Sequence, residues 1–239
     1  MTVKFKIVSF IGYLCLMALL LALGKWQLNR AEEKRQLLQL QAQQASSDTV
    51  HLSLVSEDNI GNLRYKNTQI TGHFDVDHQF LLDNQISMGK AGYFVLTPFR
   101  LEGAQKAVLI NRGWLPSNLN RAMLPDLTIM HKEQITLTGR INHFPSVGVK
   151  LAGAEIPTDS WPSIVQVVDH SILSKKLGYP LLNFQIELDK NMPEGYKREW
   201  QNSTTISPEK HKAYAFQWFL LAFTVTILFI WSCFKKQHD

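Results

Sequence analysis

The chain has 239 residues, and 25 Lys and Arg against 20 Asp and Glu give it a net charge of +5. Four of these basic residues and one acidic residue lie outside residues 24–212, which leaves 21 basic and 19 acidic side chains in that 189-residue stretch. This small net charge argues against the strongly basic surface that is typical of nucleic-acid-binding domains. We therefore expect no nucleic-acid partner. The only cysteines are Cys15 and Cys233, near the two ends. A disulfide framework and a Cys-based zinc or copper site are therefore excluded between them.

The first apolar segment runs from Ile7 to Leu23, after a short N-terminal segment of residues 1–6 that contains two lysines. It predicts a transmembrane helix, and a cleaved signal peptide is the alternative. The apolar region of a signal peptide usually has about 7–15 residues and precedes a small-x-small cleavage site. This segment has 17 residues and no clear site of that kind follows it. We therefore favour a retained membrane anchor.

Residues 24–44 follow this anchor and keep a helical composition rich in Leu, Gln, Glu, Lys and Arg. We expect the helix to continue through this lead-in segment beyond the membrane. Trp26 would then lie at the membrane interface, where Trp and Tyr are enriched.

The second apolar segment, Ala213–Phe234, has 22 residues without a charge. At about 1.5 Å per residue it reaches roughly 33 Å, which is enough to cross a hydrocarbon core. Aromatic residues gather at both of its ends, and residues 235–239 follow as a short tail. It predicts a second transmembrane helix, so residues 24–212 would lie on one side of a membrane. Flanking charges do not orient the chain, because long loops cross membranes largely regardless of charge. No mitochondrial transit peptide precedes the first helix, which favours a bacterial inner membrane.

The stretch between the two anchors has the pattern of a mainly antiparallel β domain. Seven short segments alternate or are rich in β-branched and aromatic residues, with Gly, Pro, Asn and Asp between them: 65–74, 79–82, 93–99, 106–114, 134–141, 163–168 and 182–188. This pattern predicts a single barrel or sandwich. Asp169 is expected to cap a short helix that ends at Gly178.

Signatures of common catalytic sites are missing: the sequence has no G-x-S-x-G, H-E-x-x-H, P-loop, G-x-G-x-x-G or C-x-x-C motif. We therefore expect a protein that is not an enzyme and has no metal site, although catalytic residues scattered along the chain would escape this search. His73 and His78 are close enough in sequence to be weighed as a metal pair. They flank a turn-like segment around Asp75, and we favour the turn.

Asn111-Arg112-Gly113-Trp114 closes the most apolar of the predicted strands. An Arg beside a Trp can stack its guanidinium on the indole or bind a carboxylate through two hydrogen bonds. This suggests a contact with a partner or ligand. The alternative is a strand end in which Gly113 permits a tight bend and Arg112 pairs internally. Spacing alone favours the internal pairing.

His211 lies just before the second apolar segment. On a helix, Tyr214 and Trp218 are three and seven positions further along on the same face, so the three side chains would form an aromatic niche with one imidazole. Such an imidazole could be an axial ligand of a haem iron. The alternative is a polar interface residue beside an ordinary aromatic belt, and spacing alone favours that reading.

Several stretches resemble the surfeit-locus family of cytochrome c oxidase assembly proteins. Its G-x-W-Q-x-x-R motif, its strand motifs and its closing H-x-x-Y-A-x-x-W motif correspond, in order, to residues 24–30, 72–75, 81–84, 92–98, 108–116 and 211–218. The resemblance covers nearly the whole chain. Lys212 departs from the smaller or apolar residue expected there, and residues 118–162 match only loosely.

The resemblance implies an assembly factor of haem-copper cytochrome c oxidase that binds haem a or hands it to the catalytic subunit. It marks His211 as the candidate axial ligand. Tyr214 and Trp218, placed beside His211 by helical spacing, are then the candidate walls of the haem pocket, and Trp26 is a further candidate haem-binding residue. The alternative is a membrane-anchored scaffold that binds oxidase subunits without haem, with Asn111, Arg112, Gly113 and Trp114 as its contact. Implied partners are the catalytic subunit, the haem a synthesis enzymes and membrane lipid. The resemblance also implies a location in a bacterial inner membrane, with both termini in the cytoplasm and residues 24–212 forming a periplasmic domain.

Overall fold

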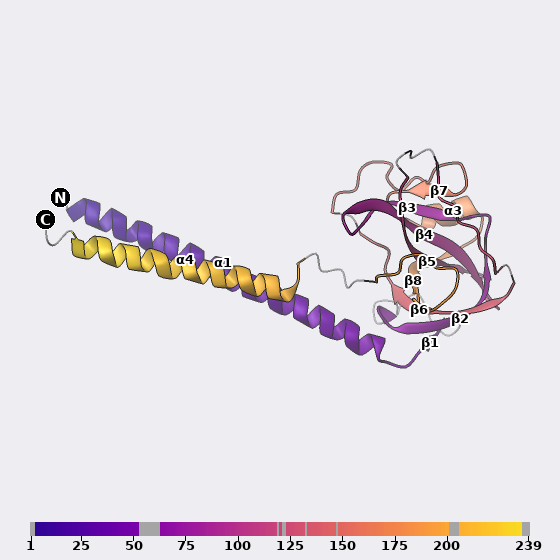
Figure 1. The fold of residues 1–239 in the computed structure, drawn as a ribbon, viewed down its shortest axis with the longest axis horizontal. Coiled ribbons are helices and arrows are strands. Elements are labelled where there is room, and N and C mark those ends of the chain that lie inside the picture. Colours follow the sequence, from indigo (N-terminus) through magenta and orange to yellow (C-terminus); the bar gives the residue numbers. More distant parts are fainter. Residues whose placement is uncertain are drawn as a thin grey trace. The chain divides into compact units, whose positions relative to one another are not determined.

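A computed structural model of the chain describes residues 3–52, 63–118, 120, 123–131, 133–146, 148–200 and 206–235. The outer parts of the two expected terminal segments, residues 1–2 and 236–239, lie outside the described residues. The chain forms two compact units (Figure 1). One combines Met1–Gln41 with Gln201–Asp239, and the other comprises Ala42–Trp200.

The first unit contains two long helices, α1 (Val3–Ala45) and α4 (Pro208–Lys235). Both are long and apolar enough to cross a membrane. α1 continues without a break from its apolar half into the polar segment that follows. The start of α4 has a cap, because the Ser207 hydroxyl accepts the N–H of Lys210 at 3.4 Å and Pro208 occupies the first helical position.

The two helices pack side by side and run antiparallel (Figure 1). Near the chain ends, the Tyr13 hydroxyl bonds the Thr226 hydroxyl at 3.0 Å, and the Tyr13 ring stacks on Phe229 with 4.3 Å between centroids. The interface is lined by small residues seven positions apart on each helix: Gly24 and Ala31 on α1, Ala215 and Ala222 on α4. Small side chains at such positions let two membrane helices approach closely.

The second unit is a β-barrel with a small helix. Its strands are β1 (Val50–His51), β2 (Asn67–Phe74), β3 (Phe80–Ser87), β4 (Lys90–Leu101), β5 (Ala107–Pro116), β6 (Ile135–Asn142), β7 (Ser163–Val165) and β8 (Leu181–Leu188). The sheet order is β1-β2-β6-β8-β5-β4-β3-β7, and β2 also pairs with β4. That last pairing closes a five-stranded ring of β2, β6, β8, β5 and β4. The predicted fold class, two membrane-type helices flanking a mainly antiparallel barrel-like domain, is confirmed.

Three strand pairs are parallel, β1–β2, β3–β7 and β5–β8. The last segment predicted as a strand before the helix, 163–168, is shorter than expected, because β7 ends at Val165. Helix α3 (His170–Leu177) then begins as predicted. The Asp169 carboxylate accepts the backbone N–H groups of Ser171 and Ile172, and Gly178 ends the helix with φ 76°.

The surroundings of β5 explain why its sequence is so apolar for a strand: its first eight residues are buried. Val108 and Ile110 point into the barrel core, whereas Ala107 and Leu109 belong to a second apolar cluster that includes Leu173 of α3. Successive side chains of a strand point to opposite faces, so β5 is covered on both of them. A strand buried on both faces has no polar alternation.

Candidate functional site

His211, the predicted haem ligand, bonds a residue of the other long helix. Its Nδ1 lies 2.7 Å from the amide oxygen of Gln27, across 184 residues of sequence. His211 is only 8% exposed. An amide oxygen can only accept a hydrogen bond, so Nδ1 carries a proton. The one-proton form of the ring then has its lone pair on Nε2.

Close helix packing brings the two residues together. Gly24 lies one turn before Gln27, and a Cβ atom at Gly24 would lie 2.5 Å from Cε1 of Phe219. Any side chain there would therefore push against α4. His211 lies in the first turn of α4, where its backbone N–H donates to the Ser207 carbonyl at 3.2 Å. The close contact at Gly24 thus positions Gln27 on α1, and the capped first turn of α4 positions His211.

The aromatic residues predicted near His211 are placed differently from one another. Trp26 is 50% exposed and Tyr214 is 45% exposed, whereas Trp218 is partly buried. Arg30 lies over the Trp26 ring, with 5.8 Å between Cζ and the centroid, and pairs with Glu33 at 2.7 Å. Exposed aromatic rings at these positions are typical of a membrane interface. They are equally suited to lining a binding site for a flat apolar ligand.

The donor set of this helix pair fits a haem with one protein ligand. It offers an imidazole whose Nδ1–H is held by an oxygen acceptor, the usual arrangement of metal-binding histidines. Exposed aromatic groups lie at neighbouring positions of both helices. The roles of His211, Tyr214, Trp218 and Trp26 toward haem stay predictions.

The second predicted site, Asn111–Trp114, lies in β5 with its side chains bonded inside the barrel domain. The Asn111 amide donates to Gln185 Oε1 at 3.1 Å and accepts the Gly113 N–H at 3.1 Å. The Trp114 indole N–H donates to the Gln85 carbonyl at 2.9 Å. This segment therefore has internal bonding partners, and partner binding by Asn111–Trp114 stays a prediction.

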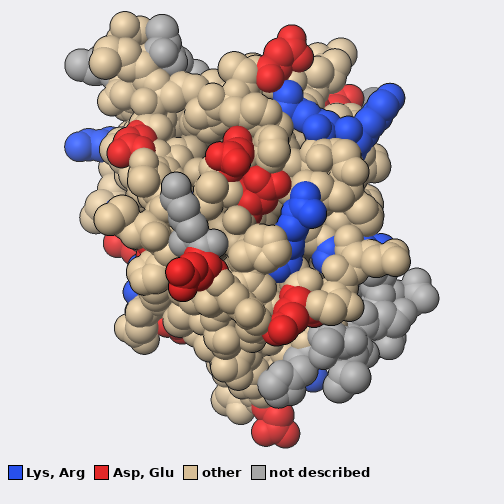
Figure 2. Space-filling model, turned by 90° about the vertical axis from the view of Figure 1, so that its right-hand side faces the viewer, with Lys and Arg blue, Asp and Glu red and all other residues tan. Residues whose placement is uncertain are grey.

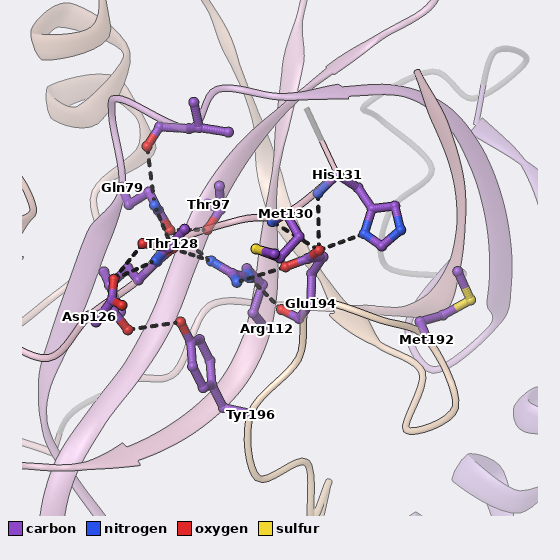
Figure 3. A network of polar contacts seen from close by, with 12 residues as sticks. Gln79, Thr97, Arg112, Asp126, Thr128, Met130, His131, Met192, Glu194 and Tyr196 are labelled. Atoms are coloured by element: carbon purple, nitrogen blue, oxygen red, sulfur yellow. Dashed lines mark hydrogen bonds and ion pairs between the residues drawn. The ribbon is translucent and has the colours of Figure 1, made fainter. Parts of the chain in front are cut away.

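Arg112 is the centre of a buried polar network (Figure 3). It is 1% exposed, and Nε donates to the backbone carbonyl of Glu194 at 2.6 Å. Nη1 donates to Gln79 Oε1 at 2.8 Å and to the Leu127 carbonyl at 3.3 Å. The Gln79 oxygen also accepts the Thr97 hydroxyl at 3.0 Å. Burial lowers the pKa of the Arg112 guanidinium, and the nearby Glu194 counteracts that effect.

The Glu194 side chain extends this network to a loop (Figure 3). Its Oε1 accepts the backbone N–H groups of Met130 and His131, each at 3.1 Å, and Nδ1 of the His131 ring at 2.6 Å. Its Oε2 lies 3.8 Å from Nη2 of Arg112. Burial raises the pKa of Glu194, but these hydrogen bonds and Arg112 outweigh it, so the pKa lies below its ordinary value.

The network fastens residues 194–198, the segment that precedes the second long helix in sequence, onto β5. The Tyr196 N–H donates to the Arg112 carbonyl at 2.7 Å, and the Trp114 N–H donates to the Lys197 carbonyl at 2.8 Å. Gly113 has φ 115°, and a Cβ there would lie 2.8 Å from the Lys197 oxygen. The tight bend and the internal pairing of Arg112 are thus present together.

The histidine pair weighed as a metal site is divided between two environments. His73 is exposed on β2, whereas His78 bonds Asp75 through Nδ1 at 2.8 Å and lies against Trp161. Asp75 also accepts the Tyr179 hydroxyl at 2.6 Å. Within the described residues, no group of three or more His, Cys, Asp or Glu could hold a metal ion.

Charged side chains of both signs are interspersed over the face shown in Figure 2, with wide uncharged areas between them. That face offers no single continuous basic surface. It matches the small charge balance of the stretch between the two apolar segments.

Two residues that the sequence did not single out complete these sites. Gln27 lies in the G-x-W-Q-x-x-R stretch, but nothing local pairs it with His211, 184 residues away. Glu194 carries no motif at all, and its φ of 62° is visible only in the structure. For Gln27, its place beside Trp26 in the motif was the available signal.

The fold and site define a class of protein: one unit is a pair of membrane-type helices joined by a histidine–glutamine hydrogen bond, and the other is a domain with a closed five-stranded β ring. The SURF1 family model matches residues 14–223, and the chain belongs to the SURF1 family. A SURF1-like protein of Rickettsia bellii is 29% identical over 221 residues, which cover 88% of this chain and 85% of that protein. A SURF1-like protein of Rickettsia conorii is 27% identical over 222 residues, covering 89% and 85%. The yeast cytochrome oxidase assembly protein SHY1 is 27% identical over 110 residues, covering 46% of this chain and 28% of that protein.

Proposed function

We propose that this protein takes part in the assembly of cytochrome oxidase. Membership of the SURF1 family carries the proposal, together with similarity to a yeast protein named for cytochrome oxidase assembly. The proposed role is binding and positioning rather than catalysis, in keeping with a sequence that has none of the catalytic motifs sought. The matched region, residues 14–223, spans most of α1, the whole barrel domain and the first half of α4, so the proposal concerns both units of the chain.

The proposed step is the holding of haem a and its transfer to the catalytic subunit of a haem-copper oxidase. His211 is the proposed axial ligand, and Trp26, Tyr214 and Trp218 are the proposed aromatic surroundings. The hydrogen bond that holds Nδ1 of the His211 imidazole supports this role. A single imidazole suits transfer, because one iron–nitrogen bond is easier to release than two.

The proposed location is a bacterial inner membrane, with both termini in the cytoplasm and the barrel domain in the periplasm. Two helices of spanning length support a membrane anchor at each end, and bacterial relatives cover most of the chain. The proposed partners are the oxidase catalytic subunit, the enzymes of haem a synthesis and membrane lipid.

The first test is a strain from which the gene is deleted. Oxidase activity and the a-type haem absorbance of its membranes should both fall, while other cytochromes stay normal. Expression of the full chain should restore both signals. Unchanged activity and absorbance in the deletion strain, with no second family member present, would contradict the assembly role.

The second test addresses haem. Full-length protein produced together with haem a synthesis should purify with haem, and His211→Ala protein should lose most of it. His170→Ala, on α3 of the barrel domain, is the matched control and should keep its haem. Haem-free wild-type protein that still captures the catalytic subunit would replace haem binding with the scaffold function.

A further inference from the structure

The hydrogen bond between Gln27 and His211 gives a specific task to a residue that so far has none. We propose that Gln27 is a positioning residue, which holds the His211 imidazole in the tautomer that presents Nε2 as the ligand atom for a haem iron. This inference rests on the proposed haem binding by His211. It adds the residue that controls the protonation and orientation of that ligand.

The tautomer follows from the atoms that meet. Nδ1 of His211 lies 2.7 Å from Oε1 of Gln27, and an amide oxygen has no proton to give. The shared hydrogen therefore belongs to Nδ1, and the lone pair of the neutral ring is on Nε2. Metal-binding histidines commonly donate their second N–H to an oxygen acceptor, which fixes the ring and makes the ligand nitrogen more basic.

The surroundings make this bond consequential. His211 is 8% exposed, so water cannot readily replace the Gln27 oxygen as the acceptor for Nδ1. A buried N–H that loses its acceptor is costly, and this cost would drive the ring to rotate or to exchange tautomers. Gly24 lets the helices approach one turn away, and this holds the Gln27 backbone close to α4.

The choice of an amide over a carboxylate also has a chemical meaning. A carboxylate in place of the Gln27 amide would draw the Nδ1 proton toward itself and give the ring imidazolate character. Such a ring binds iron more tightly and stabilises the ferric state. The neutral amide orients the ring without that effect, so it keeps the ligand weak enough for release.

The experiment uses the full chain in lipid nanodiscs with hemin as the probe. Nitrogen-15 NMR of histidine-labelled protein without hemin reports which ring nitrogen of His211 carries the proton. Hemin titration followed by absorbance and electron paramagnetic resonance reports affinity and axial ligation, and a spectroelectrochemical titration reports the reduction potential of the bound hemin. The variants are Gln27→Leu, Gln27→Glu and His211→Ala, with Gln39→Leu at an exposed position of the same helix as the matched control.

In the wild type and in Gln39→Leu, Nδ1 should be protonated. Gln27→Leu should lose this fixed tautomer and bind hemin about 10- to 100-fold more weakly, the usual effect of removing the partner of a ligand histidine. Gln27→Glu should keep hemin ligation and shift its reduction potential to more negative values, a change that a packing role alone would not produce.

Two results would overturn parts of the scheme separately. Gln27→Leu protein with an unchanged tautomer and hemin affinity within about twofold of the wild type, while His211→Ala loses ligation, would remove Gln27 from the site and leave the ligand in place. His211→Ala protein with unchanged hemin ligation would overturn the ligand itself, and with it the role of Gln27. If Gln27→Leu fails to fold, the reduction potential of hemin bound to Gln27→Glu decides instead. A potential equal to that of the wild type would overturn the role of Gln27.

Discussion

The guanidinium of Arg112 donates from Nε to the backbone carbonyl of Glu194 at 2.6 Å, joining positions 82 residues apart. Arg112 belongs to β5, a strand of the closed ring, whereas Glu194 lies in the segment after β8. The same segment then pairs with Trp114 through Lys197. Residues 194–198 are thereby attached to β5 within the barrel domain.

We predict that Arg112→Lys strongly destabilises the barrel domain. Lysine keeps the charge but cannot reproduce the forked donors that reach Glu194, Gln79 and Leu127 together. Breaking a buried charged network of this kind costs about 3–5 kcal/mol. Thermal unfolding of the full-length protein in detergent, followed by near-ultraviolet circular dichroism, measures the loss. Arg100→Lys at an exposed position of β4 is the control and should shift the midpoint little; equal shifts would refute the special role of Arg112.

We predict that acid weakens the attachment of residues 194–198. The pKa of Glu194 lies below its ordinary value near 4.5, so the folded state binds the proton less readily than the unfolded state. The stabilisation from Glu194 is therefore fully present above that ordinary value and is lost as pH falls through the folded value. Unfolding midpoints between about pH 7 and pH 3 should fall less steeply for Glu194→Gln than for the wild type. Identical slopes would show that other carboxylates carry the acid response.

We predict that Gly113→Ala destabilises the domain by more than backbone strain alone. Gly113 has φ 115°, and its Cβ would lie 2.8 Å from the Lys197 carbonyl oxygen and 2.9 Å from Cγ of Arg198. An unfavourable backbone conformation costs roughly 1–3 kcal/mol, and the clash adds to it. Gly103→Ala separates the two effects, because Gly103 has φ 71° with no atom within 4 Å of the added Cβ. If Gly113→Ala lowers the free energy of unfolding no more than Gly103→Ala does, the clash costs little, because residues 197 and 198 can shift away from the added Cβ.

Local sequence patterns predicted the parts of this molecule that depend on local physics. Uncharged length identified both long helices, and the Asp169 cap with the Gly178 stop identified α3. Alternation identified β2, in which every second residue is buried. The parallel pairing of β5 with β8 could not be predicted, because the residue pattern of a strand does not show which other strand will pair with it.

The site residues illustrate the same limit. The sequence selected His211 from its motif and its place before an apolar helix, both of which are local. Its partner Gln27 was hidden, because only the antiparallel packing of the two helices brings residues 27 and 211 together. Likewise the internal pairing of Arg112 was weighed as one alternative, but its partner Glu194 comes from a segment without any motif.

Our last prediction concerns the close approach of the long helices. Gly24→Ala places a Cβ 2.5 Å from Cε1 and 2.7 Å from Cζ of Phe219, so the ring must move or the helices must separate. Overpacking of this kind costs roughly 1–3 kcal/mol. Because Gln27 lies one turn from Gly24, separation would lengthen its bond to His211. The His211 Nδ1 proton should then exchange with solvent faster than in the wild type, as measured by NMR.

Phe219→Leu supplies the compensating change, because leucine lacks the ring atoms that meet the added Cβ. The double variant Gly24→Ala with Phe219→Leu should recover most of the slow exchange of the His211 proton. Gly12→Ala on the same helix is the control, since nothing lies within 4 Å of its added Cβ, and it should behave as the wild type. Slow exchange retained in Gly24→Ala alone would mean that Phe219 simply rotates away. The Gln27–His211 bond would then depend on the helix backbones being held together elsewhere, with the Tyr13–Thr226 contact as the next place to look.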